Sequence, residues 1–282
     1  MSTIGQLLDY GKDKLIQSGN EYAKYDRKVL LEEALGCNYM YMLTHGEEEV
    51  SQDKEQQYRS WIERRSEHYP LQYLLGYAHF MDYTFVVDEH VLIPRNDTEV
   101  LVENADIVLT DMEKQQDKIE VLDLCCGSGC IGISLKLYHK QIGLSLLDIS
   151  EDALAVTRRN LNQYGLDATV QQGNLLENIT DKYDMIVSNP PYIESHVIGT
   201  LMPEVREYEP MLALDGGEDG LMFYRSIVQQ AVSHLRKHGW LFFEIGYNQG
   251  DTVAALMKEH GFSEVQVVKD YAGLDRVVYG HL

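Results

Sequence analysis

The stretch V-L-D-L-C-C-G-S-G-C-I-G-I-S-L, residues 121–135, has the pattern of a strand, a turn of small residues and a helix. Small residues with a free φ angle allow the backbone of such a turn to approach a ligand closely. Asp148 ends the next apolar run, twenty-one residues after Gly127, and a carboxylate there can accept hydrogen bonds from ribose hydroxyls. Together these features predict a nucleoside pocket.

The turn alone does not decide which ligand binds. Its glycines would also suit tight packing of the helix without any ligand. A nicotinamide dinucleotide uses a G-x-G-x-x-G turn, whose last glycine lies where the helix N-terminus receives a pyrophosphate. Here Gly132 is only the nearest match to that third glycine. The cofactor class therefore depends on residues elsewhere in the chain.

Short apolar runs alternate with helical stretches from about residue 96 to residue 282. The runs are I-E-V-L-D-L (119–124), L-S-L-L-D (144–148), Y-D-M-I-V-S (183–188), W-L-F-F-E-I (240–245), V-Q-V-V (265–268) and R-V-V-Y (276–279). This alternation predicts an α/β fold in which helices cover both faces of a mostly parallel sheet.

The last two runs are separated by only K-D-Y-A-G-L-D, which is too short for a parallel crossover. The last strand should therefore be antiparallel. By fold-level analogy, that arrangement distinguishes many methyl-donor-binding folds from dinucleotide-binding folds. By this analogy the arrangement fits a Rossmann-like class I methyltransferase domain, while the loop itself leaves a dinucleotide cofactor open.

The first part of the chain has a different pattern. Its apolar residues recur with helical period, and Gly19, Gly36 and Gly46 fall between the periodic stretches. After these, residues 77–87 are rich in aromatic and β-branched residues around a turn-like Met81-Asp82, which predicts a hairpin. We predict a helical-bundle domain over residues 1–72, a β-hairpin linker over 73–95 and the methyltransferase domain over 96–282.

The composition is that of a folded globular protein, with 44% hydrophobic and 24% charged residues among 282. Four cysteines, Cys37, Cys125, Cys126 and Cys130, are too few and too bunched for a disulfide framework. They also lack the C-x-x-C pairing of a metal site, so no metal is expected. The sequence shows neither a secretory signal nor a run that could span a bilayer, which favours a cytoplasmic protein without a membrane partner.

The net charge of −21 arises from 24 Lys and Arg against 45 Asp and Glu. An extended basic patch that neutralises phosphates is hard to build from this balance, so direct nucleic-acid binding is not expected. Basic or neutral protein surfaces are better partners. A purely solubilising role for the charge fits equally well when the charge is considered alone.

The segment V-S-N-P-P-Y-I (187–193) follows a predicted strand at the carboxyl edge of the sheet, where open α/β folds bind ligands. Its prolines fix φ and donate no hydrogen bond, so the carbonyls of Asn189 and Pro190 lack ladder partners. The Asn189 side-chain oxygen and the Pro190 carbonyl can hold both N–H groups of a planar amide or exocyclic amine, and Tyr192 can stack on it. With an activated methyl group in line, such positioning supplies much of the catalysis. A rigid loop after a strand is the alternative interpretation.

With these residues, the chain resembles the HemK/PrmC family of protein-(glutamine-N5) methyltransferases, which modify peptide chain release factors. The resemblance covers nearly the whole chain. N-P-P-Y is shared with nucleic-acid amino methyltransferases, whereas P-L-Q-Y-L-L-G and V-L-I-P-R are far more specific. The similar segments are 64–76, 85–87, 91–99, 121–133, N-P-P-Y (189–192), P-E-V-R-E-Y-E-P (203–210), D-G-G-E-D-G-L (215–221) and E-I-G-Y-N-Q-G (244–250).

The resemblance implies S-adenosyl-L-methionine as the cofactor and, as the substrate, the glutamine of a Gly-Gly-Gln tripeptide in a class I release factor. The helical domain would dock that partner. Loop 125–129 would hold the methionine part of the cofactor, Asp148 its ribose, and 174–175 would flank the adenine. The implied cofactor-binding residues are Cys125, Cys126, Gly127, Ser128, Gly129, Asp148, Asn174, Leu175 and Asn189. The implied substrate-binding residues are Asn189, Pro190, Pro191 and Tyr192, of which Asn189, Pro190 and Tyr192 are the catalytic candidates.

Three residues depart from the family pattern. Cys125 stands where glycine is usual, Asn174 where aspartate is frequent, and Asn96 where proline usually follows the arginine at 95. None of the three belongs to N-P-P-Y.

Four further polar residues have open roles. Arg95, Thr98 and Glu99 would line a cleft or cap the first helix of the α/β domain, and the N-terminal signature favours capping for Thr98 and Glu99. Glu244 ends a strand at the ligand edge, where it would face the substrate or be paired internally.

Two alternative functions stay open at this point. A methyltransferase acting on an exocyclic base nitrogen of DNA or RNA would use the same N-P-P-Y acceptors for a flipped base, although the acidic balance opposes it. A donor-binding module that regulates a partner without catalysis would not need an intact N-P-P-Y.

Overall fold

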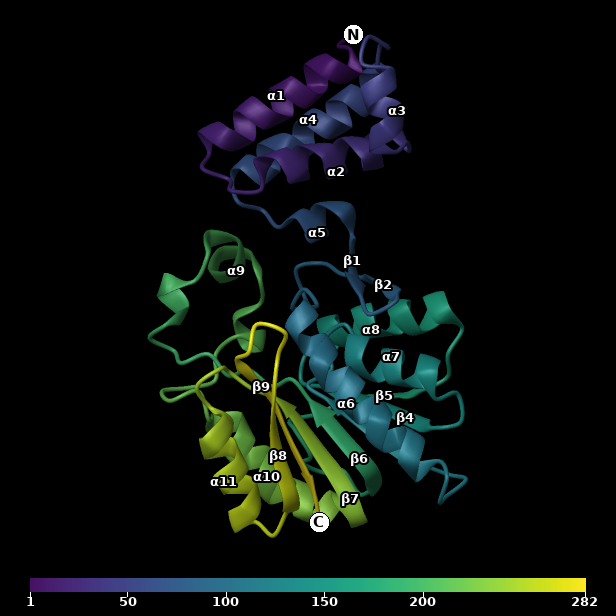
Figure 1. Ribbon diagram of the computed structural model, residues 1–282, viewed down its shortest axis with the longest axis vertical. Coiled ribbons are helices and arrows are strands. Elements are labelled where there is room, and N and C mark those ends of the chain that lie inside the picture. Colours follow the sequence, from purple (N-terminus) through teal and green to yellow (C-terminus); the bar gives the residue numbers. More distant parts are fainter. The chain divides into compact units, whose positions relative to one another are not determined.

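The computed structural model describes residues Met1–Leu282 (Figure 1). The chain divides into two compact units. The first unit comprises Met1–Gly76 and Met202–Tyr208, and the second comprises Tyr77–Leu201 and Glu209–Leu282. None of the helices is long and apolar enough to cross a bilayer.

The first unit is entirely helical, as its periodic apolar pattern predicts. Its helices are α1 (Ile4–Gln17), α2 (Ala23–Leu35), α3 (Tyr39–Thr44), α4 (Gln52–Ser66), α5 (Leu71–Leu75) and α9 (Pro203–Tyr208). Leu7, Leu30 and Ile62 are completely buried in its core. Thr3 begins α1 with a capping box, in which its hydroxyl accepts from the Gln6 N–H.

Helix α9 belongs to the first unit although it lies far along the chain from the other helices. The buried Arg65 contacts Asp26 at 2.7 Å and Glu204 at 2.8 Å. The Tyr208 hydroxyl donates to the Glu67 carbonyl at 2.8 Å, and its ring packs edge-on against Tyr69. These contacts hold the segment within the helical unit.

The second unit begins with the predicted hairpin. Strands β1 (Tyr77–Phe80) and β2 (Tyr83–Val86) pair antiparallel around Met81, whose φ is 51°. The Asn160 side chain of α8 (Glu151–Tyr164) accepts from Val86 N at 2.7 Å, so the hairpin is held against that helix. The hairpin prediction is confirmed.

The sheet of the second unit has seven strands in the order β5-β4-β3-β6-β7-β9-β8. The strands are β3 (Glu120–Leu124), β4 (Gly143–Asp148), β5 (Thr169–Gln172), β6 (Tyr183–Ser188), β7 (Leu235–Glu244), β8 (Ser263–Lys269) and β9 (Asp275–His281). Strands β3 to β7 are parallel, and β9 is antiparallel to both of its neighbours. The predicted mostly parallel sheet with an antiparallel last strand is confirmed.

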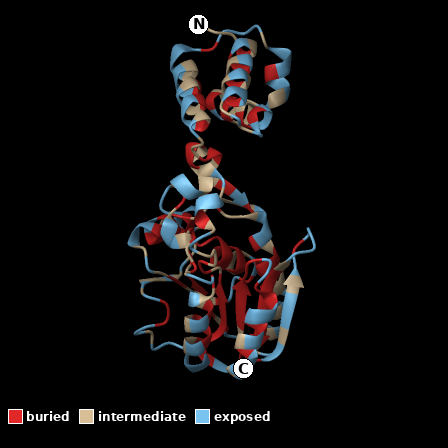
Figure 2. Cartoon of the chain, turned by 90° about the vertical axis from the view of Figure 1, so that its left-hand side faces the viewer, coloured by how far each residue is buried: buried red, intermediate tan, exposed pale blue.

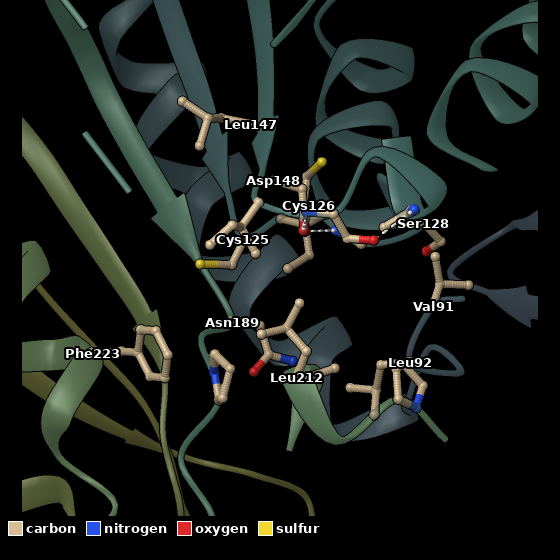
Figure 3. Close-up of a pocket in the computed structure, with 18 of the residues that line it drawn as sticks. Val91, Leu92, Cys125, Cys126, Ser128, Leu147, Asp148, Asn189, Leu212 and Phe223 are labelled. Carbon is tan, nitrogen blue, oxygen red and sulfur yellow. Dashed lines mark hydrogen bonds between the residues drawn. The ribbon is translucent and has the colours of Figure 1, made fainter. Parts of the chain in front are cut away.

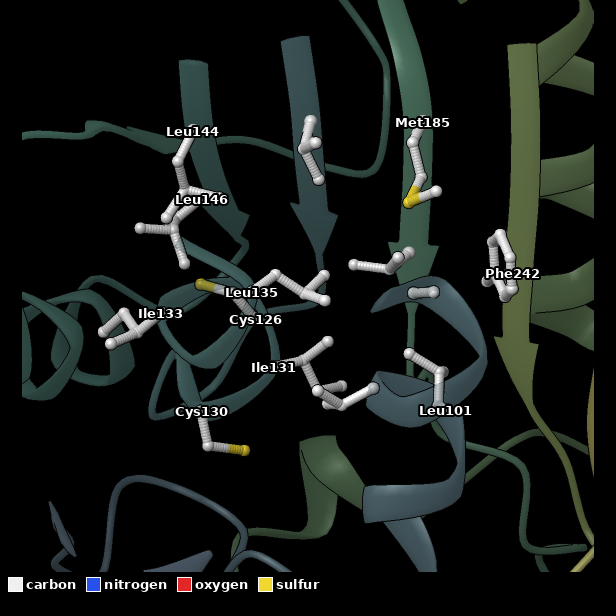
Figure 4. Packing of buried hydrophobic residues seen from close by; sticks show 14 of the residues in the cluster. Leu101, Cys126, Cys130, Ile131, Ile133, Leu135, Leu144, Leu146, Met185 and Phe242 are labelled. Atoms are coloured by element: carbon white, nitrogen blue, oxygen red, sulfur yellow. The ribbon is translucent and has the colours of Figure 1, made fainter. Parts of the chain in front are cut away.

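Helices cover both faces of this sheet, and buried residues concentrate in its central strands (Figure 2). On one face, α6 (Asn96–Met112), α7 (Cys130–Tyr138) and α8 pack on side chains such as Val121 and Met185 (Figure 4). On the other, α10 (Met222–His234) and α11 (Gly250–Glu259) pack on side chains such as Leu122 and Ile186. Successive residues of β3 thus enter opposite cores, as the period of two of a strand requires.

The strand order places β3 between β4 and β6, and the chain changes direction across the sheet at this point. Ligands of open α/β sheets bind beyond the carboxyl ends of the strands at such a switch point. Two short 3₁₀ helices, Ile198–Thr200 and Met211–Ala213, lie in the long connection between β6 and α10. Residues of that connection also lie at this edge of the sheet.

Candidate active site

A cavity of about 350 Å³ lies at the carboxyl ends of β3, β4 and β6 (Figure 3). Most of the residues predicted from the sequence meet there. Those that line it are Cys125, Cys126, Gly127, Ser128, Asp148, Asn174, Leu175, Asn189 and Pro191. Gly129, Pro190 and Tyr192 are not among its lining residues.

The loop after β3 takes a path that needs three residues with positive φ. Gly127 and Gly129 have φ of 53° and 78°, and Cys125 has φ of 60°. Cys125 therefore adopts the left-handed conformation that the usual glycine would adopt, at a steric cost of about 1 kcal/mol. The cysteine at this position thus has a φ angle that glycine adopts readily.

The two glycines of this loop have different surroundings. A Cβ on Gly127 would meet no atom within 4 Å, so its backbone is open on that side. A Cβ on Gly129 would approach Ile133 at 3.0 Å and Thr157 at 3.1 Å. Gly129 thus permits close packing at the start of α7, whereas Gly127 leaves the backbone accessible for a ligand.

Asp148, the last residue of β4, ties the loop in place. Its Oδ2 accepts from Gly127 N and its Oδ1 from Ser150 N, both at 2.9 Å. Burial raises the pKa of this carboxyl, while these backbone N–H groups oppose the increase. Each oxygen keeps a second lone pair, so the group can still accept from two adjacent hydroxyls of a ligand.

The remaining walls of the cavity are largely apolar and come from three segments distant in sequence: Val91 and Leu92 before α6, Leu212 after β6, and Phe223 on α10. In Figure 3 Asn189 and Leu212 lie across the cavity from Cys126 and Asp148. Apolar walls with a few convergent polar groups are typical of a cofactor site.

Glu209 joins two of these walls. Its buried carboxylate pairs with Arg95 and accepts from Ile93 N at 3.3 Å. Pro94 precedes Arg95 in the chain and Pro210 follows Glu209, and both prolines line the cavity. The family-specific segments around residues 91–95 and 209–210 therefore meet at the site, a role that the sequence alone did not reveal.

Asn189 lies half-buried where strand pairing stops. The pairings of β6 with β3 and β7 both end at Ser188, so the carbonyls of Asn189 and Pro190 have no strand partner. The Asn189 Nδ2 donates to Thr98 Oγ1 at 3.5 Å. This contact leaves Oδ1 as the available acceptor of the amide.

Tyr192 is tied to the neighbouring strand end. Its hydroxyl donates to Glu244 Oε1 at 3.1 Å, and its carbonyl accepts from Gln249 Nε2 at 3.1 Å. Burial and the nearby Glu244 carboxylate raise the pKa of Tyr192. The structure thus pairs Glu244 internally, and stacking of Tyr192 on a substrate stays a prediction.

The interpretation of Thr98 and Glu99 as caps is wrong. Helix α6 begins at Asn96, its cap residue is Arg95, and no side chain caps it. Thr98 lines the cavity and accepts from Asn189, and Glu99 Oε1 accepts from Met81 N at 2.7 Å. Both side chains are used for contacts distant in sequence, which a local motif cannot indicate.

Comparison with known proteins agrees with this geometry. Residues 6–76 match the model of the PrmC N-terminal domain, and residues 99–204 match that of the Methyltransferase small domain. The release factor glutamine methyltransferase of Geobacter sulfurreducens is 39% identical over 99% of this chain and 97% of its own length. The chain belongs to the release factor glutamine methyltransferase family. The enzyme of that name from Clostridium acetobutylicum is 37% identical over 94% of this chain and 93% of its own length.

Two solved structures share the fold of this chain at low sequence identity. The catalytic domain of hMettl16, in complex with an RNA hairpin, matches with a TM-score of 0.55 at 15% identity, over 70% of this chain and 74% of that one. A Thermus thermophilus 16S rRNA methyltransferase matches with a TM-score of 0.51 at 19% identity, over 73% of this chain and 49% of that one. The chain is a methyltransferase with a Rossmann-like fold, which excludes the nicotinamide alternative.

Proposed function

We propose that this enzyme methylates the side-chain amide nitrogen, N5, of the glutamine in the Gly-Gly-Gln motif of class I peptide chain release factors. The methyl donor is S-adenosyl-L-methionine. The observation that carries the proposal is the fixed Asn189 amide at the cavity edge, in a chain that matches release factor glutamine methyltransferases over nearly its whole length.

The residues of the cavity fit the donor. Its methionine part would lie along Cys125–Ser128, where the backbone at Gly127 is open. The Asp148 oxygens would accept from the ribose hydroxyls, and Asn174 and Leu175 would flank the adenine. Gly129 would support the loop from behind through its packing on α7. When bound, S-adenosyl-L-methionine supplies an electrophilic methyl group on a sulfonium centre.

Asn189 and Pro190 would hold the substrate amide. The Asn189 Oδ1 and the Pro190 carbonyl each accept one of its two N–H groups, which fixes the plane of the amide and directs the nitrogen toward the methyl group. Prolines 190 and 191 stiffen this edge because their φ angles are fixed. No general base is needed, since an N-methylated amide cation is strongly acidic and releases its proton to water.

Each part of the chain would have a different role in this methylation. Residues 1–72 would dock the release factor, residues 73–95 would connect the domains, and residues 96–282 would carry the reaction. A separate family match for residues 6–76 and the net charge of −21, which suits a neutral or basic protein partner, support this division. The reaction would take place in the cytoplasm, where release factors act.

Methylation of a nucleic-acid base is the alternative, because N-P-P-Y also serves that chemistry. The excess of 45 acidic over 24 basic residues opposes it. The test supplies labelled donor with release factor, with release factor in which the motif glutamine is replaced, with duplex DNA and with ribosomal RNA. We expect label only in the unaltered release factor. Label in nucleic acid, or equal label in the substituted factor, would reverse the assignment.

A further inference from the structure

Glu244 has a buried carboxylate that the reaction scheme above does not use. It is the last residue of β7 and is 2% exposed. Its Oε1 accepts from the Tyr192 hydroxyl, but its Oε2 is buried and has no hydrogen-bond partner. A buried polar atom without a partner is costly and requires an explanation.

The nearest explanation is the hydroxyl of Thr98. This side chain is 3% exposed. Burial raises the pKa of the Glu244 carboxyl, and a contact with the Thr98 hydroxyl opposes that increase, so Thr98 lies beside the carboxylate and favours its ionised form. Its Oγ1 already accepts from Asn189 Nδ2 at 3.5 Å. A hydroxyl that accepts one hydrogen bond still has its own proton to donate, and an ionised carboxylate can only accept.

The direction of this chain of contacts decides how the Asn189 amide is oriented. The two ends of an asparagine amide are almost the same size, and their placement follows from the hydrogen-bond network. With Thr98 as acceptor, Nδ2 faces Thr98 and Oδ1 is free for a substrate N–H. If Thr98 donated to Asn189 instead, the amide would turn over and present its NH₂ to the substrate NH₂. Two donors would then face each other.

We propose that Glu244 is a positioning residue, whose Oε2 accepts the Thr98 proton and thereby fixes the Asn189 amide with Oδ1 available to the substrate. Glu244 acts through Thr98 and does not touch the reacting atoms. This inference rests on the proposed function, which supplies the identity of the substrate. Arg276, whose positive charge favours the ionised Glu244 against the effect of burial, supports the acceptor role.

Glu244→Gln tests the direction of the contacts. The variant keeps an acceptor for Tyr192 but can place an NH₂ against Thr98, with almost no change of volume. We expect kcat to fall roughly 30-fold or more, comparable with loss of one aligned polar contact at a reacting group. The KM for release factor and the dissociation constant of the donor should change by less than about threefold. The melting temperature should not fall, because a buried neutral amide has a smaller desolvation cost than a buried carboxylate.

Thr98→Val tests the path. It removes the hydroxyl and should lower kcat about as much as Glu244→Gln. The double variant should be no slower than the slower single variant, because both changes break one chain of contacts. Tyr192→Phe removes only the hydrogen bond from the Tyr192 hydroxyl to Glu244. If Tyr192→Phe lowers kcat as much as Glu244→Gln does, while Thr98→Val keeps full turnover, the path through Thr98 is wrong.

Asp184→Asn is the matched control, since Asp184 is also a buried strand carboxylate but lies near the start of β6, and accepts from Glu120 N. It should leave kcat unchanged. A parallel loss of melting temperature, donor binding and turnover in Glu244→Gln would show a merely structural role and overturn the proposal.

A second readout needs no substrate and separates this inference from the proposed function. In protein labelled with ¹⁵N-asparagine, the Asn189 side-chain NH₂ signal is identified by its loss in Asn189→Ala. We expect this signal to shift in Glu244→Gln and Thr98→Val and to stay in place in Asp184→Asn. An unmoved signal in the first two variants would overturn the positioning role. Failure of the wild-type protein to methylate release factor would instead count against the proposed function.

Discussion

The two loops that meet at the cavity, residues 125–129 and 189–192, are held in different ways. The first is shaped by its own backbone, through positive φ angles at Cys125, Gly127 and Gly129. The second is held by side chains from other elements, among them Thr98, Glu244 and Gln249. A loop of the first kind is specified locally, whereas the second depends on residues distant in sequence. Substitutions can test this difference.

Asn189→Ala should have the largest effect. It removes the oxygen that would hold the substrate amide, so we expect turnover to fall about 10³-fold or more. Donor affinity should change by only a few-fold, because the backbone-defined loop is untouched. Steady-state kinetics and calorimetric titration of the donor measure the two quantities. Equal losses in both would assign Asn189 to the donor alone and remove the distinction between the loops.

Gly129→Ala should destabilise the protein by about 3 kcal/mol, because it adds left-handed strain to a Cβ contact with Ile133 and Thr157. Gly127→Ala is its matched control, since its Cβ meets no neighbour, and it should cost only about 1 kcal/mol of strain. Urea unfolding gives both values. Similar costs for the two variants would mean that packing does not distinguish these glycines.

Asp123→Asn should change how stability depends on pH. Asp123 lies behind the first loop, its Oδ2 accepts from Gly132 N at 2.8 Å, and burial raises its pKa from 3.8 to about 7. The folded protein therefore binds a proton more tightly than the unfolded chain, and its stability falls as pH rises from about 4 to about 7. Between about pH 5 and pH 8 this loss should amount to about 2.6 kcal/mol in the wild type.

The asparagine variant should lack this loss, because its amide does not titrate. Free energies of unfolding at several pH values provide the comparison. Parallel curves of unfolding free energy against pH for the two proteins would show that Asp123 stays ionised in the folded protein throughout this pH range.

Cys125→Gly should have the smallest effect. Glycine relieves the left-handed strain but adds freedom to the unfolded chain, so we expect a gain of only about 0.5 kcal/mol in stability. Donor affinity should stay the same, because glycine readily adopts the left-handed φ angle that Cys125 already has. A several-fold change in affinity, measured by calorimetry, would mean that the thiol itself contributes to binding.

The sequence predicted the parts of the fold that local patterns encode. Apolar runs located most strands of the large sheet, and the short connection before β9 indicated its antiparallel direction. Strand β5 was missed because T-V-Q-Q is mostly polar and lies at an edge of the sheet. A half-exposed edge strand has no apolar run to detect.

The candidate site shows the same limit. Loop and strand-end residues could be placed at one edge from the order of the elements alone. The supporting contacts of Thr98, Glu209 and Gln249 could not, because each joins segments far apart in the chain. For this reason the interpretation of Thr98 as a cap of α6 was wrong, because its hydroxyl contacts Asn189, which lies far along the chain.

Helix α9 has a consequence for any attempt to separate the two units. The polypeptide passes between them three times, after Gly76, Leu201 and Tyr208. An N-terminal fragment that stops at Gly76 would deprive Arg65 of one of its two carboxylates and uncover the Tyr69 ring. Transplanting the helical unit onto another protein would therefore require the Met202–Tyr208 peptide to be grafted with it.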